Sequence, residues 1–116
     1  MMFLWLSAAL MVSTAVVHSL LGEKRLIRPI LCLDSKVTNS LLARKILRCA
    51  WHLTSVFMIS NALLVLWKGT PPGLVVVTGT AWLAVGLFDA VYTRGQHLGW
   101  PLLSGAGLFA LLGVLV

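Results

Sequence analysis

Each of the three histidines in this chain lies near one end of an apolar run, within a few turns of an acidic side chain or an arginine. His18 precedes Glu23 by five positions, and His97 follows Asp89 by eight. Neutral imidazole nitrogens and carboxylate oxygens are ligands that suit zinc and iron. The sequence therefore predicts a metal site, with zinc or iron bound by His18, His52, His97, Glu23 and Asp89.

The depth of these residues in the expected membrane helices supports that prediction. If the second apolar run crosses a membrane, Arg48 lies at an interface and His52 about 6 Å deeper, from the helical rise of about 1.5 Å per residue. Ionisable groups at such depths usually face the interior of a bundle and mark a functional site. Five neighbours at the same level are predicted to support the ligands or to contact a substrate: Arg48, Tyr92, Trp51, Trp100 and Gln96.

No short ligand motif such as HExxH is present, so several uses of this polar pocket stay open. A metal with a free coordination position would allow an enzyme that acts on a lipid-soluble substrate. Two of the histidines would also suit haem iron as axial ligands. Protonation changes at His18, His52 and Asp89 would instead serve a small proton-coupled transporter. In the remaining alternative, the chain is a non-catalytic accessory or assembly subunit of a membrane complex.

The composition predicts the solvent in which these residues work. The chain has 59% hydrophobic and 10% charged residues and a mean hydropathy of +0.99. Soluble domains carry about 25% charged residues, so this chain is predicted to be an all-α membrane protein. At about 20 residues per crossing, its length allows a single domain of four transmembrane helices. The predicted spans are residues 2–21, 46–67, 74–92 and 97–116.

The distribution of basic residues predicts the orientation of these spans. All nine lysines and arginines except Lys68 fall before the second span, at its start, or between the third and fourth spans. Basic residues collect on the cytoplasmic side of short-loop membrane proteins. The expected protein is therefore a multi-pass protein of the cytoplasmic (inner) membrane, with both termini outside. Nucleic acid is not an expected partner, because the basic residues are not interleaved with aromatic residues on a soluble surface.

The longer cytoplasmic connection contains an apolar segment, residues 26–33, that is expected to lie in the headgroup plane. Asp34, Ser35 and Asn39 are candidate caps for the next helix, and its arginines would meet the anionic inner leaflet. The expected partners are membrane lipids, with a homo-oligomer or a larger membrane complex left open. The two cysteines, at positions 32 and 49, lack the spacing of a zinc or disulfide motif and are expected to be free thiols.

Helical spacing predicts one inward face on each span, because small and hydroxyl residues mark the sides by which membrane helices approach. These faces would bring the polar groups together near the cytoplasmic end, where Asp89 is expected to pair with Arg94 or Arg48. The predicted stripes are Ser7, Met11, Thr14 and His18; Arg44, Arg48, His52 and Ser55; Thr78, Trp82, Gly86 and Asp89; and His97, Pro101, Ser104 and Leu108.

Overall fold

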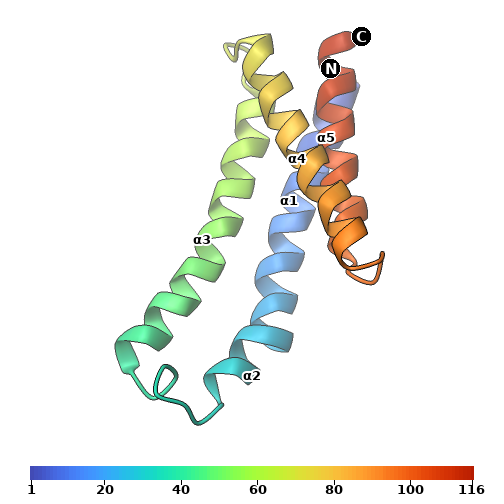
Figure 1. The fold of residues 1–116 in the computed structure, drawn as a ribbon. Coiled ribbons are helices and arrows are strands. Elements are labelled where there is room, and N and C mark those ends of the chain that lie inside the picture. The colour runs from blue at the N-terminus through green and yellow to red at the C-terminus, as the bar shows by residue number, and fades with distance from the viewer.

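Four long helices make up most of the molecule, which we describe from a computed structural model of all 116 residues (Figure 1). There is no strand, so the prediction of an all-α fold with four helices is confirmed. The elements in chain order are α1 (Met2–Gly22), η1 (Glu23–Ile27), α2 (Arg28–Leu31), α3 (Leu41–Leu66), α4 (Pro72–Tyr92) and α5 (Gly99–Leu115).

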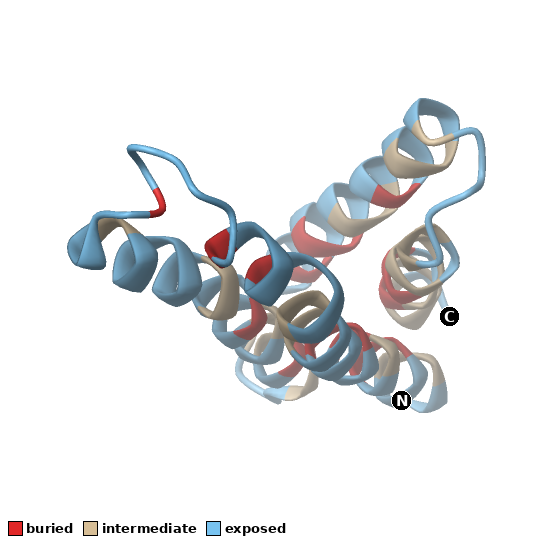
Figure 2. Ribbon diagram, turned by 90° about the horizontal axis from the view of Figure 1, so that it is seen from below, coloured by how far each residue is buried: buried red, intermediate tan, exposed pale blue.

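Three of these helices are long and apolar enough to cross a membrane: the continuous run Met2–Leu31, α3 and α4. Helix α5 is equally apolar in character but has 17 residues, fewer than the predicted fourth span. Helix α3 begins at Leu41, five residues before the predicted second span. The first ten residues of α3 are almost all exposed, because this part of the helix projects past the bundle (Figure 2).

The two ends of the molecule differ in what they contain. Both termini and the turn between α3 and α4 lie at one end, which we call the terminal end (Figure 1). Element η1, α2, the connection to α3 and the turn between α4 and α5 lie toward the opposite end, which we call the loop end. At the latter turn, Arg94 and Gly95 have φ values of 53° and 75°. This left-handed backbone reverses the chain so that α5 returns along α4.

The apolar segment after α1 is helical and continues that helix. Element η1 is a wide π-type turn in which the Arg28 N–H donates to the Glu23 carbonyl oxygen. Pro29 follows at once, and its ring cannot fit against the carbonyl one turn earlier in a regular α-helix. The wide turn accommodates Pro29 without ending the helix, and it changes the face on which the following residues lie.

The N-terminus of α3 is capped by Ser40, whose Oγ accepts a hydrogen bond from the Ala43 N–H at 3.3 Å. The predicted caps were wrong because Asp34, Ser35 and Asn39 form contacts within the connection instead. Asn39 Nδ2 donates to Asp34 Oδ1 at 2.7 Å, and Ser35 Oγ accepts from the Thr38 N–H at 3.1 Å. These bonds order the chain before the helix starts.

Helix α5 packs against both α4 and α1, and small residues allow the backbones to approach. A Cβ atom at Gly107 would overlap the backbone nitrogen of Leu83, so no larger residue fits there. Next to it, Ser7 Oγ of α1 donates to the Ala106 carbonyl oxygen at 2.7 Å. The predicted inward stripe on the fourth helix was wrong at three of its four positions, and only Ser104 lies against a neighbouring helix, at Gly86 of α4. Ala106, Gly107 and Ala110 are buried, whereas His97, Pro101 and Leu108 are exposed.

The first and third predicted stripes agree better with burial. Ser7, Met11 and Thr14 are buried on α1, and Thr78 and Gly86 are buried on α4. Helix α3 packs mainly on α1 and has few contacts with α4, although a short turn joins α3 to α4. The two helices diverge from that turn toward the loop end (Figure 1). Space is thereby left beside α3 for the cavities described below.

Candidate functional site

A polar cluster holds the loop end of α1 against α3. Arg48 donates from a terminal guanidinium nitrogen to Glu23 Oε1 at 2.9 Å. On the other carboxylate oxygen, His52 Nε2 lies 3.1 Å from Glu23 Oε2. Arg28 adds a longer contact, with its Nε 3.6 Å from Glu23 Oε1. The Glu23 side chain is 17% exposed, less than any of its partners, so it is the centre of this cluster.

The cluster continues into the bundle through two hydroxyl groups. His52 Nδ1 lies 3.0 Å from Ser19 Oγ, and Ser19 Oγ donates to the buried Ser55 Oγ at 2.7 Å. Glu23, His52, Ser19 and Ser55 thus form one hydrogen-bonded chain. The sequence interpretation did not include Ser19 in the site. Its spacing of four residues from Glu23 would have placed both on one helical face.

His18 lies on a neighbouring face of α1 and is held by α3. Its ring stacks on Trp51, with ring centroids 4.1 Å apart and planes at 10°. The Trp51 indole N–H donates to the His18 carbonyl oxygen at 3.0 Å. His18 Nε2 lies 2.8 Å from Thr54 Oγ1. Gly22 makes this arrangement possible, because a Cβ atom there would overlap the Trp51 ring.

A second acid–histidine pair lies at the turn between α4 and α5. His97 Nδ1 is 2.6 Å from Asp89 Oδ2, and the His97 backbone N–H donates to Thr93 Oγ1 at 3.3 Å. The predicted pairing of Asp89 with Arg94 or Arg48 was wrong. The left-handed turn folds His97 back over Asp89, while Arg48 is already engaged by Glu23 across the α1–α3 contact.

A cavity of about 490 Å³, called here the loop-end cavity, is lined by residues of α1, η1 and α3 and by the turn before α5 and the start of α5. Its polar lining comes from Arg25 and His18 on the α1 side, Trp51 on α3, and Gln96 and His97 before α5. The rest of the wall is mostly apolar: Val17, Leu21, Leu26, Met58, Leu98, Leu102 and Leu103, with Thr14, Gly22 and Gly99. The cavity therefore combines a few polar groups with a mostly apolar wall.

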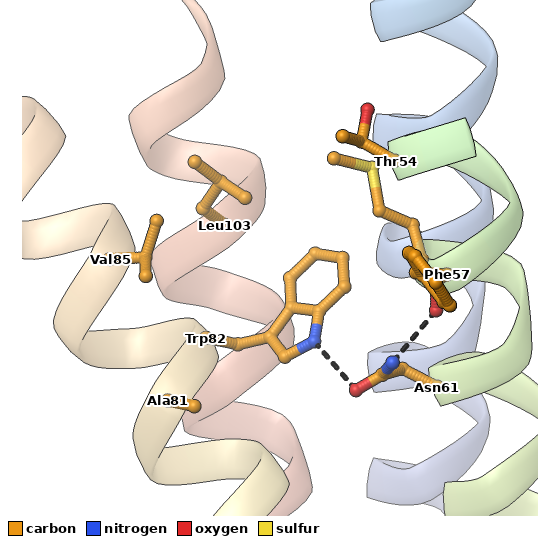
Figure 3. Close-up of a pocket in the computed structure, with 8 residues that line it drawn as sticks. Thr54, Phe57, Asn61, Ala81, Trp82, Val85 and Leu103 are labelled. Atoms are coloured by element: carbon orange, nitrogen blue, oxygen red, sulfur yellow. Dashed lines mark hydrogen bonds between the residues drawn. The ribbon is translucent and has the colours of Figure 1, made fainter. Parts of the chain in front are cut away.

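A second space of about 340 Å³, the α3–α4 groove (Figure 3), shares Met58 and Leu103 with the first cavity. It is lined by Thr54, Phe57, Met58, Asn61, Ala81, Trp82, Val85 and Leu103. Trp82 reaches from α4 toward α3, and its Nε1 donates to Asn61 Oδ1 at 3.3 Å. Asn61 Nδ2 in turn donates to the Phe57 carbonyl oxygen at 2.7 Å. The polar atoms of this groove are thus largely satisfied within the chain.

The predicted ligands are brought to one end of the molecule but are divided among separate contacts. His52 pairs with Glu23, His97 pairs with Asp89, and His18 stacks on Trp51. No group of three or more His, Cys, Asp or Glu side chains is arranged to hold a metal ion. Binding of zinc, iron or haem by these residues stays a prediction.

The predicted supporting residues also divide into two groups. Arg48 contacts Glu23 directly, and Trp51 and Gln96 line the loop-end cavity. Tyr92 is 78% exposed and stacks on Phe88 with ring centroids 5.4 Å apart. Neither Tyr92 nor Trp100 lines the loop-end cavity. Arg25, which the sequence interpretation did not select, does line it.

Comparisons with known proteins give no match that would assign this site. No family model matches the chain, and no curated protein or solved structure matches it either. The geometry and chemistry of the two cavities are therefore the guide to function.

Proposed function

We propose that this chain is an integral membrane protein that binds a small amphipathic molecule in the loop-end cavity. Three helices are long and apolar enough to span a bilayer. Large apolar side chains such as Phe57, Leu63 and Phe88 are exposed on the outside of the bundle, where lipid would cover them. These features support insertion into a membrane.

The charge distribution supports an orientation with both termini outside the cell. The basic residues of η1, α2, the connection and the start of α3 gather toward the loop end (Figure 1). Lys68 is the single basic residue in the turn at the terminal end. With the loop end in the cytoplasm, this asymmetry follows the positive-inside rule. We accordingly propose the cytoplasmic membrane as the location.

The observation that carries the functional proposal is the mixed lining of the loop-end cavity. Ligand sites in proteins usually have volumes of about 300–1,000 Å³, apolar walls and a few polar groups that fix orientation. The cavity of about 490 Å³ has this character. His18, Gln96 and His97 offer hydrogen-bonding groups, while Val17, Leu102 and Leu103 form part of the apolar wall. A molecule with one polar end and an apolar body fits this chemistry.

The two acid–histidine pairs have different tasks in this proposal. Glu23, Arg48 and His52 fix α3 against α1 and thereby hold the His18–Trp51 wall in place. Asp89 holds the His97 ring through Nδ1 and leaves Nε2 free of that contact. Nε2 accepts a hydrogen bond from the bound molecule when His97 is neutral, and donates one when it is protonated.

A small proton-coupled transporter is a second candidate, favoured by one observation. The chain from Glu23 through His52 and Ser19 to Ser55 is hydrogen-bonded at every step. Such chains of titratable and hydroxyl groups carry protons in membrane transporters. Ser19→Ala breaks the chain, so it should abolish proton uptake by proteoliposomes if this candidate is right.

The principal test is native mass spectrometry of the purified protein in a neutral detergent after incubation with single amphiphiles. Dodecanoate, dodecylamine and the uncharged ester monolaurin serve as probes. We expect at least one of them to form a saturable one-to-one adduct. Val17→Trp should abolish this adduct, because Val17 lines the cavity and the indole would fill it.

Val16→Trp is the matched control, since Val16 is the neighbouring valine, is also exposed and does not line the cavity. It should leave the adduct unchanged. Absence of a saturable adduct with all three probes would contradict the proposal, as would equal loss of the adduct in both tryptophan variants.

A further inference from the structure

The loop-end cavity and the α3–α4 groove share two wall residues, Met58 and Leu103. Both side chains are half-buried. Methionine is unbranched and has three rotatable side-chain bonds, so it adapts readily to a neighbouring ligand. A change of the Met58 side chain would join the two spaces into one slot that extends from Trp51 to Asn61 along α3. That distance is about 15 Å at a helical rise of about 1.5 Å per residue.

We propose that this joined slot binds one single-chain lipid with an anionic headgroup, drawn from the surrounding membrane. The headgroup lies beside Arg25 and His97, and the chain runs past Met58 and Leu103 toward Trp82. This inference rests on the proposed function and specifies its ligand.

The charge at the loop end supports an anionic headgroup. Among the residues that line the cavity, Arg25 carries a full positive charge and no acidic residue is present. Arg28 and Arg48 are both engaged by Glu23, and Asp89 is engaged by His97, whereas Arg25 makes no ion pair. A guanidinium group binds carboxylates and phosphates through paired hydrogen bonds. An anion in the cavity would provide the partner that Arg25 lacks within the chain.

The groove supports a single apolar chain. Phe57, Ala81 and Val85 line it and are exposed, so the groove is open at the side that would face lipid. Trp82 and Asn61 are hydrogen-bonded to each other, so a ligand in the groove need not supply a polar partner for the Trp82 N–H (Figure 3). At about 340 Å³ and with a mostly apolar lining, the groove has the size and chemistry to hold one apolar chain.

The test of the headgroup compares dodecanoate with monolaurin, which has the same chain and no charge. In native mass spectrometry, Arg25→Gln should weaken dodecanoate binding about tenfold, the effect of one lost charge-assisted contact, and leave monolaurin binding unchanged. Arg25→Lys keeps the charge and should lose less. Arg44→Gln is the matched control, because Arg44 is exposed, makes no ion pair and does not line the cavity.

The test of the chain compares octanoate with hexadecanoate. Val85→Trp fills the groove but not the loop-end cavity, so it should weaken hexadecanoate binding about tenfold more than octanoate binding. Val77→Trp is the control on the same helix, since Val77 is exposed and lines neither space. Circular dichroism of each variant establishes that the helices are intact.

The outcomes separate this inference from the function on which it rests. One outcome is that dodecanoate and monolaurin bind equally, that Arg25→Gln has no effect, and that Val17→Trp abolishes binding. This result would overturn the anionic headgroup but keep the cavity as a site for amphiphiles. Equal effects of Val85→Trp on both chain lengths would overturn the chain placement. Displacement of dodecanoate by acetate or inorganic phosphate would show a site for free anions and overturn the lipid. If the parent protein bound none of the amphiphiles, both proposals would be refuted.

Discussion

The two helix pairs of this protein are held together by opposite means. Helices α4 and α5 meet through small residues, so that Gly79, Gly86 and Gly107 lie directly against the neighbouring helix. Helix α1 and the adjoining η1 meet α3 at the loop end through Glu23, Arg48 and a chain of hydrogen bonds. Along the two helices the first contact uses backbone packing, and its one acid–histidine pair, Asp89 with His97, lies at the turn before α5. The second contact depends on charge and on satisfied polar atoms.

The difference indicates that α4 and α5 form the scaffold, whereas the contact of α1 with α3 positions residues of the proposed site. Packing of small residues needs no polar compensation and drives helix association inside a bilayer. Polar groups in the same setting are unfavourable unless each finds a partner. Where such a contact joins two helices of the proposed membrane protein, it is best explained by what it positions. Here it positions His18 and Trp51 at the wall of the loop-end cavity.

The largest effect is expected from breaking the small-residue contact. Gly107→Leu would force a side chain into the Leu83 backbone and should destabilise the fold by about 3 kcal/mol or prevent folding. Thermal unfolding in detergent, followed by circular dichroism, measures this. Gly73→Leu is the control, because a Cβ atom at Gly73 meets nothing within 4 Å. If both variants unfold at the parent temperature, the α4–α5 contact is not the scaffold.

A smaller effect is expected from breaking the polar contact. Glu23→Gln removes the charge that pairs with Arg48 and His52, so the melting temperature should fall, but by less than in Gly107→Leu. The fall should shrink in high salt, because the Arg48 side chain is 49% exposed and its ion pair is screened. Asp34→Asn is the control, since the Asp34 carboxylate accepts a hydrogen bond from Asn39 in the connection and forms no ion pair. A larger loss than in Gly107→Leu would reverse our assignment of the scaffold.

Removing a hydroxyl group from the same contact shows whether the hydrogen-bonded chain contributes to stability in addition to the ion pair. Ser19→Ala leaves His52 Nδ1 and the buried Ser55 Oγ without their shared partner. We expect a loss of about 1 kcal/mol in the free energy of unfolding, typical of one hydrogen bond. Ser13→Ala is the matched control, because Ser13 is exposed on the same helix. Equal stability of the two variants would mean that Ser19 contributes no more than a surface serine.

The four helices and the end of the molecule at which the polar residues lie were predictable, because the length of an apolar run and the spacing of charges are local properties of the chain. The pairing of Asp89 with His97 was not, since it depends on the left-handed backbone at Arg94 and Gly95. Ser40 and Ser19 were missed for a similar reason: their partners are set by where a helix starts and how two helices are rotated. The division of the histidines among three contacts is a result of tertiary packing.

Elemental analysis of the protein beside a triple alanine variant of His18, His52 and His97 tests metal binding.

The smallest effect is expected at Tyr92, which was predicted from its level in the chain to support the site. Its ring stacks on Phe88 at the surface and does not line the loop-end cavity. Tyr92→Leu should therefore change neither the affinity for the amphiphile probes nor the unfolding free energy by more than about 0.5 kcal/mol. Gln96→Leu makes the informative contrast, because Gln96 lines the cavity and its loss should weaken binding. If Tyr92→Leu bound the probes more weakly than Gln96→Leu, the residues of the site would be determined by their position along the helix axis. The side of the helix that faces the cavity would then not be decisive.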